Sequence, residues 1–515
     1  MRKKIGLVLF MILFCGVAAA PLAHSFKGTV TVGLPQEAPT MDPNITTNAI
    51  GFLLWGWAYD SLVKYDMYTK KFNPWLAEKW KRVGPTAYKF WLRKDAKFAD
   101  GTPVTAEAVK LSMDRIQDPK LKSRQRRYYK AWKSFEIIDD HTFIWHLKWS
   151  DNGLLGLLNR AFLIINPKAK GKGKADIARN TYGGGAYVLK SWSKGTKMIF
   201  EPNPHWWGNS KYPNRPKKII VRRILEQTTR VKALLTGEVD IIQGVAAHLL
   251  PQIDKHPKTR TQVVPAVRVF YLSFATKFGG PFADRNVRLA VNYAIDADKI
   301  RKSLVRGLAD PFHSIYHPWT FSGHDPNIRW YGYDLAKAKA YMKKSAYPNG
   351  FKALYNTTRG RFAFDKQMGE AIAGMVKEIG IDMKVRASNF PLYRKTVISY
   401  RDKKQKLPGL MFRSWGNSFM DTTQVQRGTS SCGGPWSVAC YPELDELNEK
   451  AAATLDLAKQ HELFKKVTLK MKELAMHKIL FKNKQAFGIR NSLKFKARGD
   501  DTMNPWDMVQ TKATN

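Results

Sequence analysis

The chain has 515 residues, of which 44% are hydrophobic and 25% are charged. A chain this long and this apolar can bury more than one hydrophobic core, which excludes intrinsic disorder and indicates two or three domains. The formal net charge of +44 excludes no fold, because net charge acts on solubility and encounter, but it points to nucleic acid, anionic membrane or acidic ligands as partners.

The first 25 residues have the three-part pattern of a secretory signal. Arg2–Lys4 are basic, Ile5–Val17 form an uncharged apolar run, and small residues follow as far as Ser25. The run is shorter than the roughly 20 residues that a membrane-spanning helix needs. We therefore expect cleavage before Phe26 and a periplasmic protein. A lipid on Cys15 is the alternative, which the bulky residue before it disfavours. An exported protein meets little nucleic acid, so we expect no nucleic-acid partner.

In the N-terminal half, alternating apolar patterns predict strands and patterns of helical period predict helices. Thr105 is a suitable N-cap for one helix, and Gly237 can end another. The run Gly183–Gly185 predicts a tight turn and a crossing between domains. We expect strands over 28–33, 88–92, 142–147 and 217–225, and helices over 50–63, from 105 onwards and over 230–237.

In the C-terminal half we expect helices over 288–306 and 365–379, followed by a strand over 381–385. Apolar residues then recur at the spacing of a buried helix stripe, at Phe464, Val467, Met471 and Leu474. Helices and strands are mixed along the whole chain, which indicates an α/β or α+β protein.

The signatures of zinc proteases, serine hydrolases and P-loop nucleotide-binding proteins are absent from the sequence. His313 and His317 have the spacing of metal ligands on a helix, but Pro311 and Pro318 flank them and predict a loop instead. We therefore expect no metal, no cofactor, no catalytic residues and a protein that is not an enzyme.

Cationic and aromatic residues are interleaved over 122–133, a composition typical of nucleic-acid-binding surfaces. Because the chain carries an export signal, we favour the alternative, a solvated basic helix face whose aromatic side chains pack inward.

Two cysteines remain after the signal, Cys432 and Cys440, in a segment rich in Gly, Ser and Pro. In an oxidising compartment such a pair predicts a disulfide, which would stabilise the fold by roughly 2–3 kcal/mol through closure of a short loop. Two cysteines without paired histidines supply too few ligands for zinc.

Several segments, taken in order, resemble the peptide-type substrate-binding proteins of ABC importers, solute-binding family 5. The most distinctive runs from Phe90 to Val109. The others are 59–66, 74–80, 183–189, 203–207, 233–240, 281–296 and 333–340. The resemblance implies a two-lobed α/β periplasmic-binding-protein fold (cluster C, type II-like) with an extra subdomain, three subdomains in all. It also implies a monomer that closes on an intact ligand and passes it to an inner-membrane ABC permease.

The resemblance further implies a division of the chain. After the signal peptide, 1–25, lobe I takes three separate segments, the extra subdomain II takes 66–180, and lobe III takes 269–484. The segments of lobe I are 26–65, 181–268 and 485–515.

In peptide-binding relatives an Asp in the segment Trp-Gly-x-Asp-x-x-Asp-Pro holds the ligand's free amine. Here Trp415 opens the segment, Asn417 follows, Ser418 occupies the amine-binding position, and Asp421 matches the second Asp. A hydroxyl cannot supply the charge-assisted bond that a buried ammonium needs, which argues against an ordinary free-amine dipeptide. If the alignment is shifted, Asp421 takes that role.

By the same resemblance Arg359 or Arg361 clamps the ligand carboxylate, the alternative being a surface arginine. Trp415 is expected in the pocket wall. The segment after the first strand is expected to face the cleft with Thr46, Thr47 and Asn48. The cysteine pair also falls where dipeptide-binding relatives carry one.

The expected ligand is a peptide or a peptide-like solute. Nickel chelates, haem, opines or sugars are alternatives on the same fold, and a secreted hydrolase or a nucleic-acid-binding protein are alternatives of another class. For the basic excess we hypothesise either adaptation to an acidic periplasm or a preference for anionic ligands.

Overall fold

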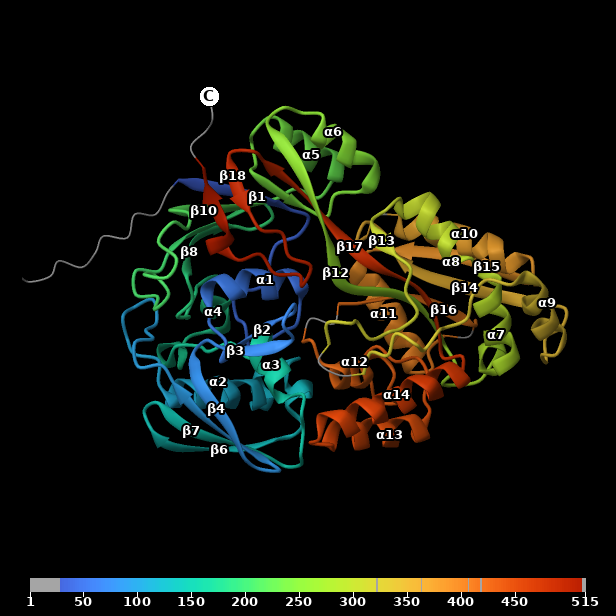
Figure 1. Ribbon diagram of the computed structural model, residues 1–515, viewed down its shortest axis with the longest axis horizontal. Coiled ribbons are helices and arrows are strands. Elements are labelled where there is room, and N and C mark those ends of the chain that lie inside the picture. The colour runs from blue at the N-terminus through green and yellow to red at the C-terminus, as the bar shows by residue number, and fades with distance from the viewer. Residues whose placement is uncertain (1–27, 321–322, 363, 406, 417–418, 512–515) are drawn as a thin grey trace, which may run out of the picture.

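The computed structural model shows two bodies side by side (Figure 1). The residues it describes are 28–320, 323–362, 364–405, 407–416 and 419–511. The expected signal peptide and its cleavage site, together with Asn417 and Ser418, lie outside the described residues. The termini of the described chain belong to the same body, on the blue side of the picture.

One mixed sheet of eleven strands extends through both bodies. Its strands are β1 (Thr29–Leu34), β8 (Tyr187–Ser193), β9 (Lys197–Pro202), β10 (Lys218–Arg223), β11 (Ile241–Gln243), β12 (Thr259–Phe274), β13 (Ala309–Asp310), β14 (Phe351–Thr358), β15 (Ile381–Ser388), β16 (Gly409–Trp415) and β17 (His477–Arg490). The order is β15-β14-β16-β12-β17-β11-β1-β10-β9-β8, with β13 beside β17. β1 runs parallel to β10 and β11, and β14 runs parallel to β15 and β16.

We call the body built on β1 and β8–β11 the N-terminal lobe. It also carries an antiparallel four-stranded sheet of order β4-β5-β7-β6 and two short hairpin-like pairs. Its remaining elements are α1 (Ala49–Ala58), β2 (Val63–Asp66), β3 (Lys71–Pro74), β4 (Ala77–Gly84), β5 (Ala87–Leu92), α2 (Ala106–Gln117), β6 (Trp132–Asp139), β7 (Thr142–Leu147), α3 (Leu154–Arg160), α4 (Lys174–Arg179), α5 (Gln227–Leu235), α6 (Leu250–Asp254), β18 (Leu493–Phe495) and β19 (Met508–Gln510).

The second lobe is built on β14, β15 and β16, with helices around them (Figure 1). Its helices are α7 (Arg285–Ala294), α8 (Ala297–Ile300), α9 (Leu335–Lys343), α10 (Asp365–Lys377), α11 (Phe390–Arg401), α12 (Thr422–Thr429), α13 (Pro442–Ala453) and α14 (Leu457–Glu473). The predicted stripe lies on α14, where Phe464, Val467 and Met471 are fully buried.

The long strands β12 and β17 cross from one lobe to the other. Their first paired stretch joins Thr259–Pro265 to Lys484–Arg490, and the second begins at Val269 opposite Lys482. Three residues of β12 therefore face a single residue of β17, and this interruption of the ladder lies between the lobes. A break in sheet pairing is a place where a strand bends readily, so the crossing can serve as a hinge.

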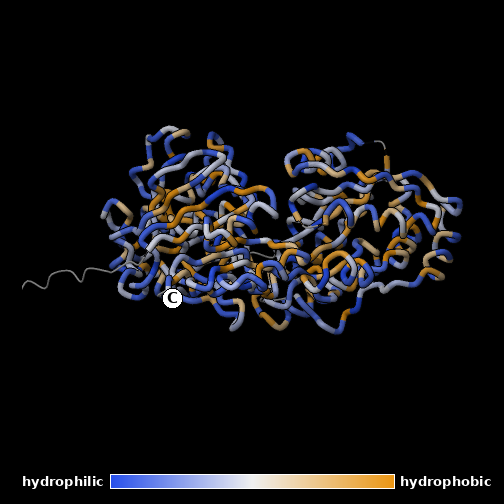
Figure 2. Tube along the Cα trace, turned by 90° about the horizontal axis from the view of Figure 1, so that it is seen from above, coloured by the Kyte–Doolittle hydropathy of each residue, from blue (hydrophilic) through white to orange (hydrophobic). Residues whose placement is uncertain are grey.

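Each lobe has its own hydrophobic core, and the hydrophobic stretches of the trace gather inside the two bodies (Figure 2). In the N-terminal lobe three indole N–H groups donate to the buried carboxylate of Asp60. They come from Trp75 (2.7 Å), Trp206 (3.3 Å) and Trp207 (3.1 Å). Burial raises the pKa of Asp60 to about 6, and the three donors limit that rise. The expected two-lobed α/β fold is confirmed.

Several predicted elements differ in extent from the observed ones. The helix expected over 50–63 ends at Ala58, because the chain turns extended there and β2 begins at Val63. The helix expected over 288–306 is broken: Ile295 is extended, and the Asp296 side chain caps the new helix α8. Thr105 stands at the N-cap of α2 but makes no side-chain cap bond.

The glycine run 183–185 does not form the predicted tight turn. Its glycines are required by close packing instead. The run lies against the C-terminal end of α1, where the Gly185 amide donates to Ala58 O at 3.1 Å. A Cβ atom on Gly183 would lie 2.0 Å from that same carbonyl oxygen, so no other residue fits there.

Candidate functional site

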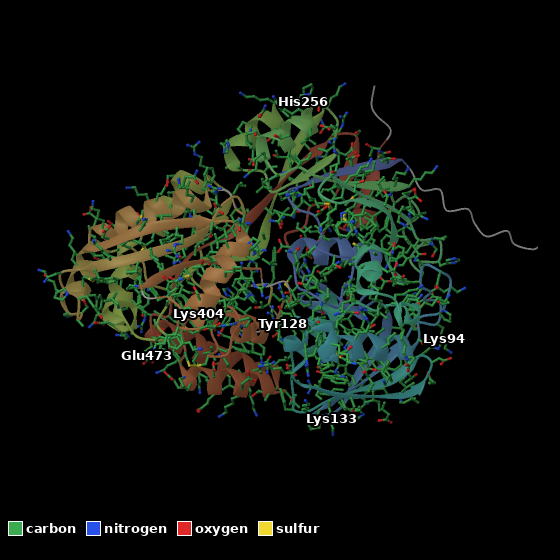
Figure 3. The ribbon with its side chains drawn as sticks, turned by 180° about the vertical axis from the view of Figure 1, so that it is seen from behind. Lys94, Tyr128, Lys133, His256, Lys404 and Glu473 are labelled. Carbon is green, nitrogen blue, oxygen red and sulfur yellow. A yellow bond between two sulfur atoms is a disulfide. The ribbon has the colours of Figure 1, made fainter. Side chains whose placement is uncertain are left out.

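A cavity of about 200 Å³ lies between the two lobes. Half of its described lining is aromatic: Phe52, Tyr128, Tyr271, Phe362, Phe390, Tyr393, Phe412, Trp415, Phe419 and Trp436. The rest is Thr47, Asn48, Ala49, Arg127, Arg268, Thr358, Arg361, Arg413, Ser414 and Gly416. Tyr128 shows the position of the cavity, because it lies where the two lobes meet (Figure 3). A concave, mostly apolar site with a few polar groups is typical of small-molecule binding.

The structure brings four of the predicted site residues together. Thr47, Asn48, Arg361 and Trp415 line the cavity, although they come from three distant parts of the chain. Asn48 also caps α1, because its side-chain oxygen accepts a hydrogen bond from Gly51 N at 3.0 Å. This cap fixes where helix α1 begins, and it thereby holds Thr47 and Asn48, which precede the helix, at the cavity.

Three other predicted residues lie away from the cavity lining. Arg359 is exposed at the end of β14. Thr46 is half-buried, and its carbonyl oxygen accepts a hydrogen bond from Gln125 Nε2 at 3.1 Å. Asp421 is buried and caps α12, accepting from Thr423 N at 2.9 Å. Asn417 and Ser418 lie outside the described residues, so their roles stay predictions.

Arg361 follows β14 and places its guanidinium over an aromatic ring. The guanidinium carbon lies 3.8 Å from the Phe390 centroid and 5.1 Å from that of Phe362, both within the range of a cation–π contact. No described residue offers its guanidinium a hydrogen-bond acceptor. Burial and the nearby charge of Arg268 lower the pKa of Arg361 to about 9.

Arg413, on β16, and Arg127, from the N-terminal lobe, have only neutral partners among the described residues. Arg413 donates to Trp436 O at 2.8 Å and to Tyr393 Oη at 3.3 Å. Arg127 donates to Tyr128 Oη at 3.0 Å and to Thr47 Oγ1 at 3.4 Å. Both guanidinium groups are therefore held in position without being neutralised.

Arg268, in the crossing strand β12, differs from these three. It forms an ion pair with Asp501 at 2.9 Å and donates to Ser414 Oγ at 3.2 Å. None of the described residues that line the cavity is an Asp or a Glu. The site is therefore cationic and aromatic, with three guanidinium groups that have no carboxylate partner in the described part of the chain.

The lobes touch each other at the cavity wall. Phe419 of the second lobe packs edge-on against Phe52 (6.0 Å between centroids) and Tyr128 (5.1 Å) of the N-terminal lobe. Farther out, Arg427 bridges Asp151 of the N-terminal lobe (2.8 Å) and Glu449 of its own lobe (2.6 Å). These contacts hold the lobes together in the structure described here.

Asp421 lies at the same junction. A Cβ atom on Gly153 of the other lobe would lie 2.3 Å from its Oδ2, so the carboxyl packs directly against the backbone of the facing lobe. That oxygen has no hydrogen-bond partner among the described residues. Burial, together with the negative charge of Asp151, raises the pKa of Asp421 to about 7.

The predicted disulfide is present, between Cys432 and Cys440. It closes a loop that contains Trp436, a wall of the cavity. The loop is held further by the backbone bond from Trp436 N to Gly428 O (3.1 Å) and by the bond that the Trp436 carbonyl accepts from Arg413. The disulfide thus supports both a ring and a guanidinium of the site.

His313 and His317 lie in the irregular segment after β13, in agreement with the expected loop. Burial lowers the pKa of both imidazoles, so both are neutral at pH 7. Within the described ranges no group of three or more His, Cys, Asp or Glu side chains is arranged to hold a metal ion.

Sequence reasoning missed several residues of the site. Arg127 and Tyr128 belong to the segment over 122–133, for which the sequence favours a solvated basic helix face whose aromatic side chains pack inward. This holds for most of the segment, since Tyr129 is buried while Lys122, Arg124, Arg126 and Lys130 are exposed, but Arg127 and Tyr128 line the cavity. Arg413 lies on β16, a strand that no pattern had predicted, and its neighbours Tyr393 and Trp436 become neighbours only in the folded chain.

Comparison with known proteins decides the family. The model described as bacterial extracellular solute-binding proteins, family 5 Middle, matches residues 71–436. The chain belongs to this family. Such proteins bind dipeptides, peptides and other ligands and deliver them to ABC transporters. A curated relative, the probable D,D-dipeptide-binding periplasmic protein DdpA of Escherichia coli K12, is 28% identical over 456 residues, 85% of each chain.

Two solved structures show how far the family 5 fold extends over the chain. The periplasmic binding protein DppA of Helicobacter pylori, in complex with peptide STSA, has a TM-score of 0.82 at 24% identity, over 95% of this chain and 99% of its own. The protein AgaA of A. tumefaciens R10, in complex with agropinic acid, has a TM-score of 0.81 at 23% identity, over 94% and 98%. Within the described residues no helix is long and apolar enough to cross a membrane.

Proposed function

We propose that this family 5 protein is the extracytoplasmic receptor of an ABC importer and captures a small peptide or peptide-like solute between its lobes. The observation that carries the proposal is the cavity, which both lobes line and which lies beside the crossing strands. Ligand contacts to both lobes favour the closed form over the open one, and a permease can recognise that difference.

The size and lining of the cavity agree with a compact ligand. Its volume of about 200 Å³ is below the roughly 300–1,000 Å³ of pockets for drug-sized ligands, which disfavours an extended oligopeptide. Thr358, Asn48 and Ser414 add neutral polar groups beside the aromatic walls.

The protein is proposed to act as a monomer in the periplasm after removal of residues 1–25, without nucleic acid as a partner and without turnover of its ligand. N-terminal sequencing of the exported protein tests the expected cleavage before Phe26. Mass spectrometry of a bound solute, before and after long incubation with the protein, tests turnover, since a receptor returns the mass unchanged.

Binding itself is tested by thermal-shift screening of the purified protein against a library of short peptides, acyl amino acids, opines and sugars. X-ray scattering is then recorded with each solute that raises the melting temperature. A receptor that closes shows one bound molecule per chain and a smaller radius of gyration. A library in which no small solute binds would contradict the proposal.

A further inference from the structure

The charged side chains of the cavity restrict the class of ligand more narrowly than the shape of the cavity does. Arg127, Arg361 and Arg413 approach the cavity without a carboxylate partner among the described residues, whereas the charge of Arg268 is balanced by Asp501. Enclosing unbalanced charges between two closed lobes is unfavourable, because closure removes the water that solvates them. A ligand that brings negative charge removes this penalty, and a ligand without net charge does not.

The acidic side chains nearest to Arg361 already have hydrogen-bond or ion-pair partners. Asp365 accepts hydrogen bonds from Thr358 Oγ1 (2.8 Å) and from the backbone N–H groups of Arg361 and Phe362. Asp501 is paired with Arg268. An ammonium group of a ligand would therefore find no free carboxylate among the described residues that line the cavity.

Positive charge reaches the site from both lobes. Arg394 of α11 has its pKa lowered by burial and by the nearby charges of Arg124 and Arg127, which belong to the other lobe. The pKa of Arg361 is likewise lowered by burial and by the nearby charge of Arg268, which lies on the crossing strand β12. Like charges that face each other across a junction oppose closure until an anion lies between them.

We propose that the ligand is a compact organic acid with at least two anionic groups, an apolar or aromatic body and no free ammonium, and that Arg361 and Arg127 bind its acid groups from opposite lobes. This inference rests on the proposed function and narrows its substrate class. The planar fork of Arg361, which lies over the Phe390 ring, is suited to a bidentate carboxylate. Arg413 adds charge while Tyr393 and Trp436 keep it in place.

The test uses four matched probes in isothermal titration calorimetry with the mature full-length protein. N-acetyl-Phe-Glu carries two negative charges, N-acetyl-Phe-Gln carries one, its amide carries none, and free Phe-Glu has the same two carboxylates with an ammonium added. We expect affinity to fall about tenfold or more with each lost charge, and about as much when the free amine replaces the acetyl group.

Matched variants assign the groups. R361Q is expected to weaken N-acetyl-Phe-Glu about 30-fold or more and to change the neutral amide less than about threefold. R361K, which keeps the charge without the fork, should fall between the two. R127Q should act in the same direction from the other lobe. R359Q, an exposed change two residues from Arg361, should leave all four affinities unaltered, and circular dichroism confirms that each variant is folded.

Equal or tighter binding of free Phe-Glu than of its acetylated form would overturn the anion inference while leaving the receptor proposal intact. The same holds if the library screen described above selects zwitterionic peptides or neutral sugars in preference to acids. If the screen selects acids with two or more anionic groups while none of these four probes binds, the inference about charge is supported, and the ligand's apolar part differs from that of the probes. A screen without any hit overturns both proposals.

Discussion

The arginines at the junction of the lobes fall into two groups that differ in their partners. Arg427, which links the lobes outside the cavity, has two carboxylates, Asp151 and Glu449. Arg361 and Arg413, inside the cavity, have aromatic rings and neutral oxygens instead. An arginine with carboxylate partners stabilises the contact between the lobes. An arginine without a carboxylate partner lowers the stability of the empty protein, and we explain it by the ligand that it binds.

The first prediction removes a partnered arginine. R427Q leaves Asp151 buried at the junction without its cation, and the loss of one partner from a buried pair is expected to cost about 3 kcal/mol or more of unfolding free energy. Urea unfolding of the variant and the wild type measures this. R427K is the control, since it keeps the charge and should recover part of the loss. Unchanged stability in R427Q would show that the pair outside the cavity contributes nothing.

The second prediction concerns Asp421, a buried acid whose folded pKa is raised from 3.8 to about 7 by burial and by Asp151. Between these two values the folded protein holds a proton that the unfolded chain releases, so stability from this group is present below pH 4 and is lost as the pH rises to 7. D421N keeps an oxygen for the cap on Thr423 and cannot ionise. We expect it to match the wild type at pH 4 and to be about 3 kcal/mol more stable at pH 8. Melting curves across this range test the difference, and a constant offset at all pH values would contradict it.

The third prediction tests whether the disulfide stabilises the cavity wall, and it changes no charged residue. The double variant C432S/C440S should lose about 2–3 kcal/mol of stability and should bind ligand more weakly, because the loop that carries Trp436 is no longer closed. Unfolding and calorimetry of the variant are compared with those of the wild type after reduction, which should give the same losses. Full affinity in the variant would show that the loop holds Trp436 without the disulfide.

The smallest stability effect is expected for the unpartnered group. R361Q should change the unfolding free energy of the empty protein by less than about 1 kcal/mol, and toward greater stability, since it removes a half-buried cation close to Arg268. Urea unfolding without ligand measures it beside R427Q. A loss as large as that of R427Q would erase the distinction between the two groups.

The sequence predicted the family and the two-lobed α/β fold, because ordered motifs such as the one from Phe90 to Val109 carry information over the whole chain. It predicted the disulfide because only two cysteines remain after the export signal. It predicted Thr47, Asn48, Arg361 and Trp415 in the cavity from the resemblance alone. The division of the chain into three subdomains stays a prediction.

The rest of the site depends on contacts between distant segments, which local patterns do not encode. Arg127 belongs to one lobe and Arg413 to the other, and only the folded chain brings them to one cavity. The long strand β12 was not predicted, because Pro265 and the bulge beside it interrupt the alternation that marks a strand. That same interruption lies at the crossing between the lobes.

Native mass spectrometry of the protein purified from its source tests the central claim most directly, because it detects the ligand that the cell supplies. The account predicts one additional mass per chain that corresponds to a compact organic acid with two or more acidic groups and no free amine, released unchanged on unfolding. A spread of free-amine peptide masses would contradict the assignment of the cationic cavity and return the ligand to ordinary peptides.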